Sequence, residues 1–360
     1  MKRFLSLVAL LALVLVACGG DISNPTSTAA DAVTTTTPPA VDAVLLSYSL
    51  AAGDEYRYEV GLDQHIELQA TGDPSLMGDE EMPGDAAVDL AGTATFTHVV
   101  SEGPEPGTFE VHITGEFTDI TVTGTVDGEP VEASETPEFA ALDPIDVTLV
   151  VDEQGNVIPE ATPGDDPLSG MFGDLGALGG NSPAPGLDPG QFIGPPLSDE
   201  EVTVGDTWEE EIETPGLGED SIVTSVNSEV TGVEDLDGVE VFVIDSNSTT
   251  STIEFDLADF FAGMFGAFLP EGATAEETAE FEEMLGQLQF LITIDGSTAN
   301  SRFWFDAAAG LARQAETTAA TNIAMDMNVP DEETGEMVGF QMDMTLDQDI
   351  TYRLLSGPDA

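Results

Sequence analysis

Apolar and polar residues alternate through one long segment near the end of the chain, residues 340–354. One set of alternate positions is apolar apart from Gln348: Phe340, Met342, Met344, Leu346, Ile350, Tyr352 and Leu354. The other set is polar: Gln341, Asp343, Thr345, Asp347, Asp349 and Arg353. Because successive side chains of a strand point to opposite faces, this pattern predicts an antiparallel sheet with one dry face and one wet face. We expect its partner strand to contain Ile323, Met325 and Met327, joined through a polar loop over residues 330–336.

Three pairs of similar segments occur in the same order along the chain. Residues 53–60 are echoed by 205–212, residues 107–113 by 238–244, and residues 147–155 by 302–310. Each segment combines a turn glycine with a strand-like run. This order predicts two copies of an antiparallel meander, with chance resemblance among β-hairpins as the alternative.

The main helical signal lies within residues 256–289. One broad helical face collects Phe260, Phe261, Met264, Phe265, Phe268 and Leu269 before Pro270 ends it. A capping box at residues 274–277 then precedes Phe281, Met284, Leu285 and Leu288 at helical spacing. The predicted fold class is therefore mainly β (a β-rich α+β fold), a duplicated antiparallel meander or half-barrel with a few apolar helices packed on one face.

The N-terminus has the layout of a secretion signal. Lys2 and Arg3 precede an apolar run over residues 4–17, too short to cross a bilayer core of roughly 30 Å. The sequence Leu15-Val16-Ala17-Cys18 resembles the lipobox of bacterial lipoproteins. That resemblance implies cleavage before Cys18, a diacylglyceryl group on its sulfur, and attachment to the extracytoplasmic face of the cell membrane. An ordinary cleaved signal with an incidental cysteine is the alternative.

A second resemblance lies at residues 202–208, Val-Thr-Val-Gly-Asp-Thr-Trp. This stretch is similar to the V-x-V-G-D-x-W signature of uncharacterised bacterial lipoproteins, for which no activity is implied. More loosely, a sheet with helices over its apolar face resembles carriers of the LolA and LprG type, which hold acylated ligands in a half-barrel. The chain departs from those carriers in being longer, internally repetitive and far more acidic, so this likeness is an analogy of fold.

Composition shifts divide the chain into five predicted parts. They are a signal peptide (1–17), a lipidated disordered tether (18–43), a first β module (44–160), a Gly/Pro-rich linker or flap (161–198), and a second β module (199–356) with a helical insert (256–289). The single cysteine excludes an internal disulfide, so burial of apolar side chains must hold the exported fold together.

The charge balance restricts the partners. The chain has 70 Asp and Glu against 6 Lys and Arg, a net charge of −64, and removal of residues 1–17 leaves four arginines and no lysine. Four arginines cannot build a basic patch, so we expect no nucleic-acid partner. The acidity has three interpretations: a salty habitat, divalent-cation binding, or a soluble and non-adhesive cell-surface protein.

We expect no enzymatic activity, cofactor or metal. The histidines, His65, His98 and His112, lack metal-ligand spacing, although His98 and His112 could face each other across neighbouring strands. There is no G-x-S-x-G motif, and Cys18 is assigned to the lipid. Paired carboxylates of the glycosidase kind remain open, because 70 acids make such pairs common by chance.

The dry face of the sheet is the predicted site. Methionines gather there, and their flexible thioethers suit an adaptable apolar surface. We expect an apolar cleft for a lipid or acyl chain lined by Phe261, Met264, Phe265, Phe268, Met325, Met342 and Met344. The expected partners are thus the membrane, through lipidated Cys18, and an apolar ligand. The alternatives are a structural or protein-interaction lipoprotein with a solid core and, less favoured, a carbohydrate-active enzyme.

Overall fold

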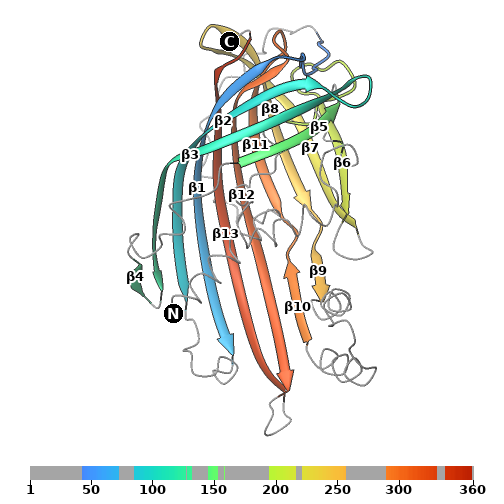
Figure 1. Cartoon of the computed structure of the whole chain (residues 1–360). Coiled ribbons are helices and arrows are strands. Elements are labelled where there is room, and N and C mark those ends of the chain that lie inside the picture. Colours follow the sequence, from blue (N-terminus) through green and yellow to red (C-terminus); the bar gives the residue numbers. More distant parts are fainter. Residues whose placement is uncertain are drawn as a thin grey trace, which may run out of the picture.

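A computed structural model describes residues 43–72, 85–126, 128–131, 145–152, 158, 194–215, 221–256, 289–330 and 337–358. All regular structure in these ranges is β-strand (Figure 1). The strands are β1 (Glu55–Gly72), β2 (Ala86–Glu102), β3 (Thr108–Val126), β4 (Glu129–Val131), β5 (Ile145–Asp152), β6 (Thr207–Pro215), β7 (Ser221–Leu236), β8 (Val239–Thr250), β9 (Ile253–Asp256), β10 (Gln289–Ile294), β11 (Thr298–Asp306), β12 (Leu311–Pro330) and β13 (Met337–Ser356). No helix in this part of the chain is long and apolar enough to cross a membrane.

The strands form one 13-stranded sheet in which all the neighbouring pairs are antiparallel. Its main order is β4-β3-β2-β1-β13-β12-β11-β8-β7-β6, while β5 pairs with β3, β10 with β12, and β9 with β10. The first long strand therefore lies beside the last one, and the pairing of β1 with β13 joins the two halves of the chain.

The predicted pairing of the methionine-rich strands is confirmed. β12 and β13 run side by side, with Met325 opposite Met342 and Ile323 opposite Met344. On β13 the alternation seen in the sequence becomes a strict alternation of buried and exposed side chains from residue 341 to 353, interrupted only where Thr345 is half-buried. We call the face with the buried set the inner face and the opposite one the outer face.

The predicted β-rich α+β fold with apolar helices on one face is wrong. Every described element is a strand, and all of the predicted helical segment 256–289 except its two end residues lies outside the described residues. The upper half of the inner face is instead covered by the sheet itself. β2 and β3 sweep across the upper end of the molecule toward β6 and β7 (Figure 1). The 18 residues of β1 and the 20 residues each of β12 and β13 are long enough for strand twist to coil the sheet in this way.

This coiling produces a single large cluster, the main core, drawn from both ends of the sheet. Its buried members are Leu46, Tyr48, Tyr56, Tyr58, Val60, Leu62, Ala94, Phe96, Val100, Val111, Ile113, Leu149, Val151, Leu197, Val202, Val230, Phe242, Ile244, Phe303, Phe305, Leu311, Ala312, Ala315, Ile350 and Tyr352. The two ends of the sheet also interact electrostatically, because the charge of Asp152 at the end of β5 acts on Glu210 of β6. Burial raises the pKa of the Glu210 carboxyl on β6, and the negative charges of Asp152 and Asp199 raise it further.

Two non-strand segments, residues 43–54 and 194–206, close the upper end of the main core. They meet at an antiparallel bridge between Val44 and Val202. The Tyr48 hydroxyl donates to the Pro195 carbonyl at 2.8 Å, and the Tyr48 ring meets Phe305 edge to face at 5.4 Å between centroids. The Trp208 indole N–H donates to the Pro196 carbonyl at 3.1 Å. These bonds satisfy polar groups that would otherwise be buried without partners.

Both segments end in a Gly-Asp turn with the same hydrogen bonds. Gly53 N donates to Val100 O and Val100 N to Asp54 O, while Gly205 N donates to Val230 O and Val230 N to Asp206 O. The aspartate side chains accept from Ala51 N and Thr203 N, respectively. Gly53 and Gly205 have φ of 101° and 96°, a region that favours glycine. The two turns therefore lead into β1 and β6 with the same hydrogen-bond geometry.

Candidate functional site

A second buried cluster lies on the lower inner face, and we call it the Met patch. Its buried members come from β1, β10, β12 and β13: Leu68, Ala70, Ile292, Ile294, Ile323, Met325, Met342 and Met344. Ile66, Ala86 and Phe340 are partly buried against it. The patch is continuous because the register aligns its members across neighbouring strands. Met342 lies between Ala70 and Met325, and Met344 between Leu68 and Ile323.

The Met patch contains three of the seven predicted cleft residues. The structure brings Met325, Met342 and Met344 together, and all three are buried, with Met344 only 2 % exposed. The other four, Phe261, Met264, Phe265 and Phe268, lie outside the described residues, in the segment between β9 and β10. Cys18, the predicted lipidation site, also lies outside them.

A pair of glutamines separates the Met patch from the main core. Gln64 on β1 lies directly opposite Gln348 on β13. Leu62 and Ile350 of the main core lie on one side of this pair, and Ile66 and Leu346 on the other. Gln64 is 7 % exposed and Gln348 is 6 % exposed, and the side-chain nitrogen of each has no hydrogen-bond partner. Sequence reasoning registered Gln348 only as a break in an apolar pattern.

Other polar side chains of the inner face form hydrogen-bonded pairs. Ser228 and Ser246 share a hydrogen bond of 2.8 Å, and Ser301 and Thr317 share one of 2.9 Å. Buried polar groups are normally paired in this way, because an unmade hydrogen bond retains its full desolvation cost. Gln64 and Gln348 differ from these pairs, because the side-chain nitrogen of each is buried without a hydrogen-bond partner.

No free positive charge accompanies the glutamines. Four arginines remain after residue 17, and all are described. Arg57, Arg302 and Arg353 are exposed at positions that alternate with the inner-face residues of their strands. Arg313 donates from Nε to the buried Asp306 carboxylate at 2.8 Å. The inner face is therefore apolar or neutral at the level of the Met patch and the glutamine pair.

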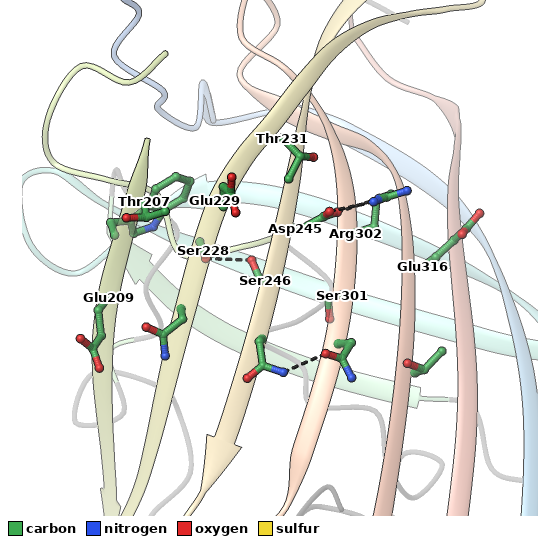
Figure 2. Close-up of a pocket in the computed structure, with 15 residues that line it drawn as sticks. Thr207, Glu209, Ser228, Glu229, Thr231, Asp245, Ser246, Ser301, Arg302 and Glu316 are labelled. Atoms are coloured by element: carbon green, nitrogen blue, oxygen red, sulfur yellow. Dashed lines mark hydrogen bonds and ion pairs between the residues drawn. The ribbon is translucent and has the colours of Figure 1, made fainter. Parts of the chain in front are cut away.

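The outer face carries an open hollow of about 840 Å³, the outer groove (Figure 2). It is lined on the outer face by Thr207, Glu209, Asn227, Glu229, Thr231, Asp245, Asn247, Asn300, Arg302, Glu316 and Thr318, together with Trp208, Ser228, Ser246 and Ser301, which alternate with them along the same strands. Arg302 holds Asp245 through two bonds, Nε to Oδ1 at 2.6 Å and Nη2 to Oδ2 at 2.7 Å. This bidentate contact raises the pKa of the Arg302 guanidinium. Asn247 donates to Asn300 at 2.8 Å.

The outer groove presents exposed acidic side chains. Figure 2 shows Glu209, Glu229 and Glu316 on different strands of the groove. All three are exposed to water, whereas the general acid of a glycosidase uses a desolvated setting. Among the described residues, no three His, Cys, Asp or Glu side chains are grouped so as to hold a metal ion. The groove thus offers a polar, acidic surface.

The histidines have three unrelated environments. His98 is buried on the inner face beside Tyr58, and burial lowers its pKa to about 3. His112 lies opposite Val99 in the ladder between β2 and β3, and contacts Asp146 at 2.6 Å. His98 and His112 therefore point to opposite faces, and the suggestion that they face each other is wrong. His65 contacts Asp89 at 2.6 Å, and this hydrogen bond raises the pKa of His65.

Comparison with known proteins leaves the family of this chain open. No protein-family model matches it, and no curated protein matches it. Among solved structures, an outer membrane channel from Pseudomonas putida F1 aligns over 86% of this chain and 97% of its own, with 8% identity and a TM-score of 0.18. OpdQ from Pseudomonas aeruginosa aligns over 84% and 98%, with 8% identity and a TM-score of 0.14. Such TM-scores do not inform on fold or function.

Proposed function

We propose that this chain is a non-catalytic binding protein that holds an apolar ligand, a lipid or acyl chain, on the lower inner face of its sheet. The observation that carries the proposal is the Met patch, a continuous apolar surface across four strands that is separate from the main core. Two strands supply three methionines to it, and unbranched thioether side chains adapt to ligands of variable shape.

The dimensions of the patch suit one acyl chain. From Leu346 to Phe340 the inner face of β13 spans seven residues, or six steps along the strand. At about 3.3 Å per residue this is about 20 Å of strand. One leaflet of a bilayer core, half of about 30 Å, has a depth of about 15 Å. A single extended acyl chain therefore fits along the patch without reaching the main core.

We further propose that the protein works at the extracytoplasmic face of the cell membrane, held there by a lipid on Cys18. The lipobox-like sequence before Cys18 supports this proposal. The proposed tether, residues 18–43, is about 25 residues long. A flexible chain of that length has a root-mean-square reach of about 25–30 Å. The Cys18→Ser variant should leave the membrane pellet and appear in the medium.

Binding is tested by native mass spectrometry of the full chain after extraction in mild detergent. We expect a co-purifying lipid mass that organic extraction removes. The Met342→Trp variant should fill the patch and weaken binding of a neutral fluorescent acyl probe by at least about tenfold, whereas Met342→Leu, which conserves volume, should bind within about threefold of wild type.

The opposing results would identify the alternative function. If no lipid co-purifies and the acyl probe shows no saturable binding, the Met patch is part of a solid core. The protein would then act through its surface, and the outer groove, with its exposed carboxylates and amides, would be the first candidate for a contact with another macromolecule.

A further inference from the structure

We infer that Gln64 and Gln348 bind the polar end of the ligand, and that this end is an uncharged hydrogen-bond acceptor such as an acyl ester or a long-chain alcohol. The inference rests on the proposed function, which places the apolar part of the ligand on the Met patch. The inference specifies the chemical group that the site selects at the polar end of the ligand.

The glutamine amides provide the donors. Both side chains are more than nine-tenths buried, and both side-chain nitrogens lack a hydrogen-bond partner. An N–H group that gives up water without gaining an acceptor destabilises the fold, so a site that keeps two such groups side by side is best explained by an acceptor that arrives from outside. A carbonyl or hydroxyl oxygen with two lone pairs can accept from both amides at once.

Register places the two donors together. Gln64 and Gln348 are direct cross-strand partners on neighbouring strands. Side chains in that relation have Cβ atoms about 4.5–5.5 Å apart, which lets both amides reach a common oxygen. Six residues separate Gln348 from Met342 along β13, or about 20 Å at the rise of a strand. The amides therefore lie at the end of the Met patch that borders the main core.

The charge of the surroundings selects a neutral ligand end. A buried carboxylate or phosphate needs a cation or a dense set of donors to offset its desolvation. Three of the four arginines are exposed on the outer face, and Arg313 already holds Asp306. A chain with a net charge of −64 also repels anions at long range. An ester or alcohol avoids both penalties and still satisfies the amides.

The test compares four ligands that each carry an 18-carbon chain with one double bond: mono-oleoylglycerol, oleyl alcohol, oleate and 1-octadecene. Each competes with a neutral fluorescent acyl probe for the full-length protein. We expect the ester and the alcohol to bind at least about tenfold more tightly than the hydrocarbon and the carboxylate. The relative affinities of the ester and the alcohol then distinguish a glycerolipid source from a fatty-alcohol source.

The variants address the two glutamines directly. Gln64→Met and Gln348→Met remove the donors at nearly constant volume, and Gln→Leu at the same positions serves as a second set if one methionine variant does not fold. Loss of the preference for the ester over 1-octadecene, with 1-octadecene affinity unchanged, supports the inference. Gln69→Met on β1 and Gln341→Met on β13 are matched controls, because both glutamines are exposed on the outer face.

Two failures have different meanings. If 1-octadecene and mono-oleoylglycerol bind equally to wild type, or if the double variant Gln64→Met/Gln348→Met keeps the preference, the glutamines do not bind the ligand and only this inference is overturned. If none of the four ligands displaces the probe, and no lipid co-purifies, the proposed function is overturned together with it.

Discussion

At the scale of single residues, Arg302 and Arg313 form ion pairs in two different environments. Arg302 pairs with Asp245 on the surface, and Arg313 pairs with the buried Asp306. Asp306 also accepts from the backbone N–H groups of Ala308 and Ala309, which shapes the turn between β11 and β12. The two ion pairs therefore contribute differently to stability, because solvent screens the exposed Arg302–Asp245 pair far more than the Arg313–Asp306 pair.

The Asp306→Ala variant should be strongly destabilised. It removes the partner of Arg313, whose side chain is only 17 % exposed, and frees two backbone donors. We expect the free energy of unfolding to fall by about 3 kcal/mol or more. The matched control is Asp245→Ala, which removes the partner of the half-exposed Arg302 and should cost less than about 1 kcal/mol. Urea unfolding followed by tryptophan fluorescence measures both, and equal losses would contradict the assignment.

His98 should make the fold sensitive to acid. Burial lowers its pKa to about 3 in the folded protein, against about 6.5 in an unfolded chain. Between these values the unfolded state binds a proton that the folded state does not, so stability falls as the pH falls below about 6.5. Relative to His98→Gln, wild type should lose up to about 1.4 kcal/mol per pH unit in this window.

The control for His98 is His65, whose pKa is raised by the hydrogen bond with Asp89. His65 stabilises the fold in its protonated form, and that contribution is lost as the pH rises through its folded pKa. The His65→Gln variant should therefore show the opposite dependence on pH. Denaturant midpoints between pH 4 and pH 8 separate the two, and parallel pH profiles for wild type and His98→Gln would contradict a buried neutral imidazole.

At the scale of elements, local sequence patterns predicted the pairing of strands that are close in the sequence. They did not predict the pairing of strands that are far apart in the sequence. The alternation at residues 340–354 predicted the partner strand that carries Ile323 and Met325, because a short loop links the two strands. The pairing of β1 with β13 joins segments almost 300 residues apart, and no turn signal records it. The glutamine pair depends on that pairing. Each glutamine interrupts an alternating apolar strand, but only the register shows that the two interruptions coincide.

Both Gly-Asp turns should be destabilised by loss of the aspartate side chain, because they share the same set of backbone and side-chain hydrogen bonds. Asp54→Ala and Asp206→Ala each remove a side-chain acceptor from a backbone N–H that precedes a long strand. We expect each to lower the free energy of unfolding by about 0.5–2 kcal/mol, the range for loss of a capping carboxylate. Asp54 also accepts from the Tyr56 hydroxyl at 3.1 Å, so its loss should be the larger one.

The control for the turns is a hairpin aspartate of another kind. Asp235 accepts from Gly238 N at 2.9 Å in the exposed turn between β7 and β8, away from the segments that close the main core. Asp235→Ala should cost no more than the smaller of the two turn variants. If Asp206→Ala has no effect on the thermal midpoint while Asp54→Ala does, the two turns are not equivalent in energy despite their shared geometry.

At the scale of the whole molecule, the described strands form one curled sheet, and no helix lies over its apolar face among the described residues. Apolar helical stripes and buried strands both present contiguous apolar residues, and the residues alone do not show which surface covers which. The main core shows the outcome. It takes Phe96 and Ile113 from one end of the sheet and Phe242 and Ile244 from the other. Coiling of long strands, a collective property, brings these ends together.

The net charge of −64 should make the stability of the whole molecule rise with salt. Carboxylates repel one another more in the compact state than in the unfolded chain, and the screening length falls from about 10 Å at 0.1 M salt to about 3 Å at 1 M. We therefore expect the thermal midpoint to rise steadily with NaCl over this range. If screening alone acts, CaCl₂ at equal ionic strength should raise it by a similar amount. A large rise at submillimolar Ca²⁺ would instead show that the acids bind cations specifically.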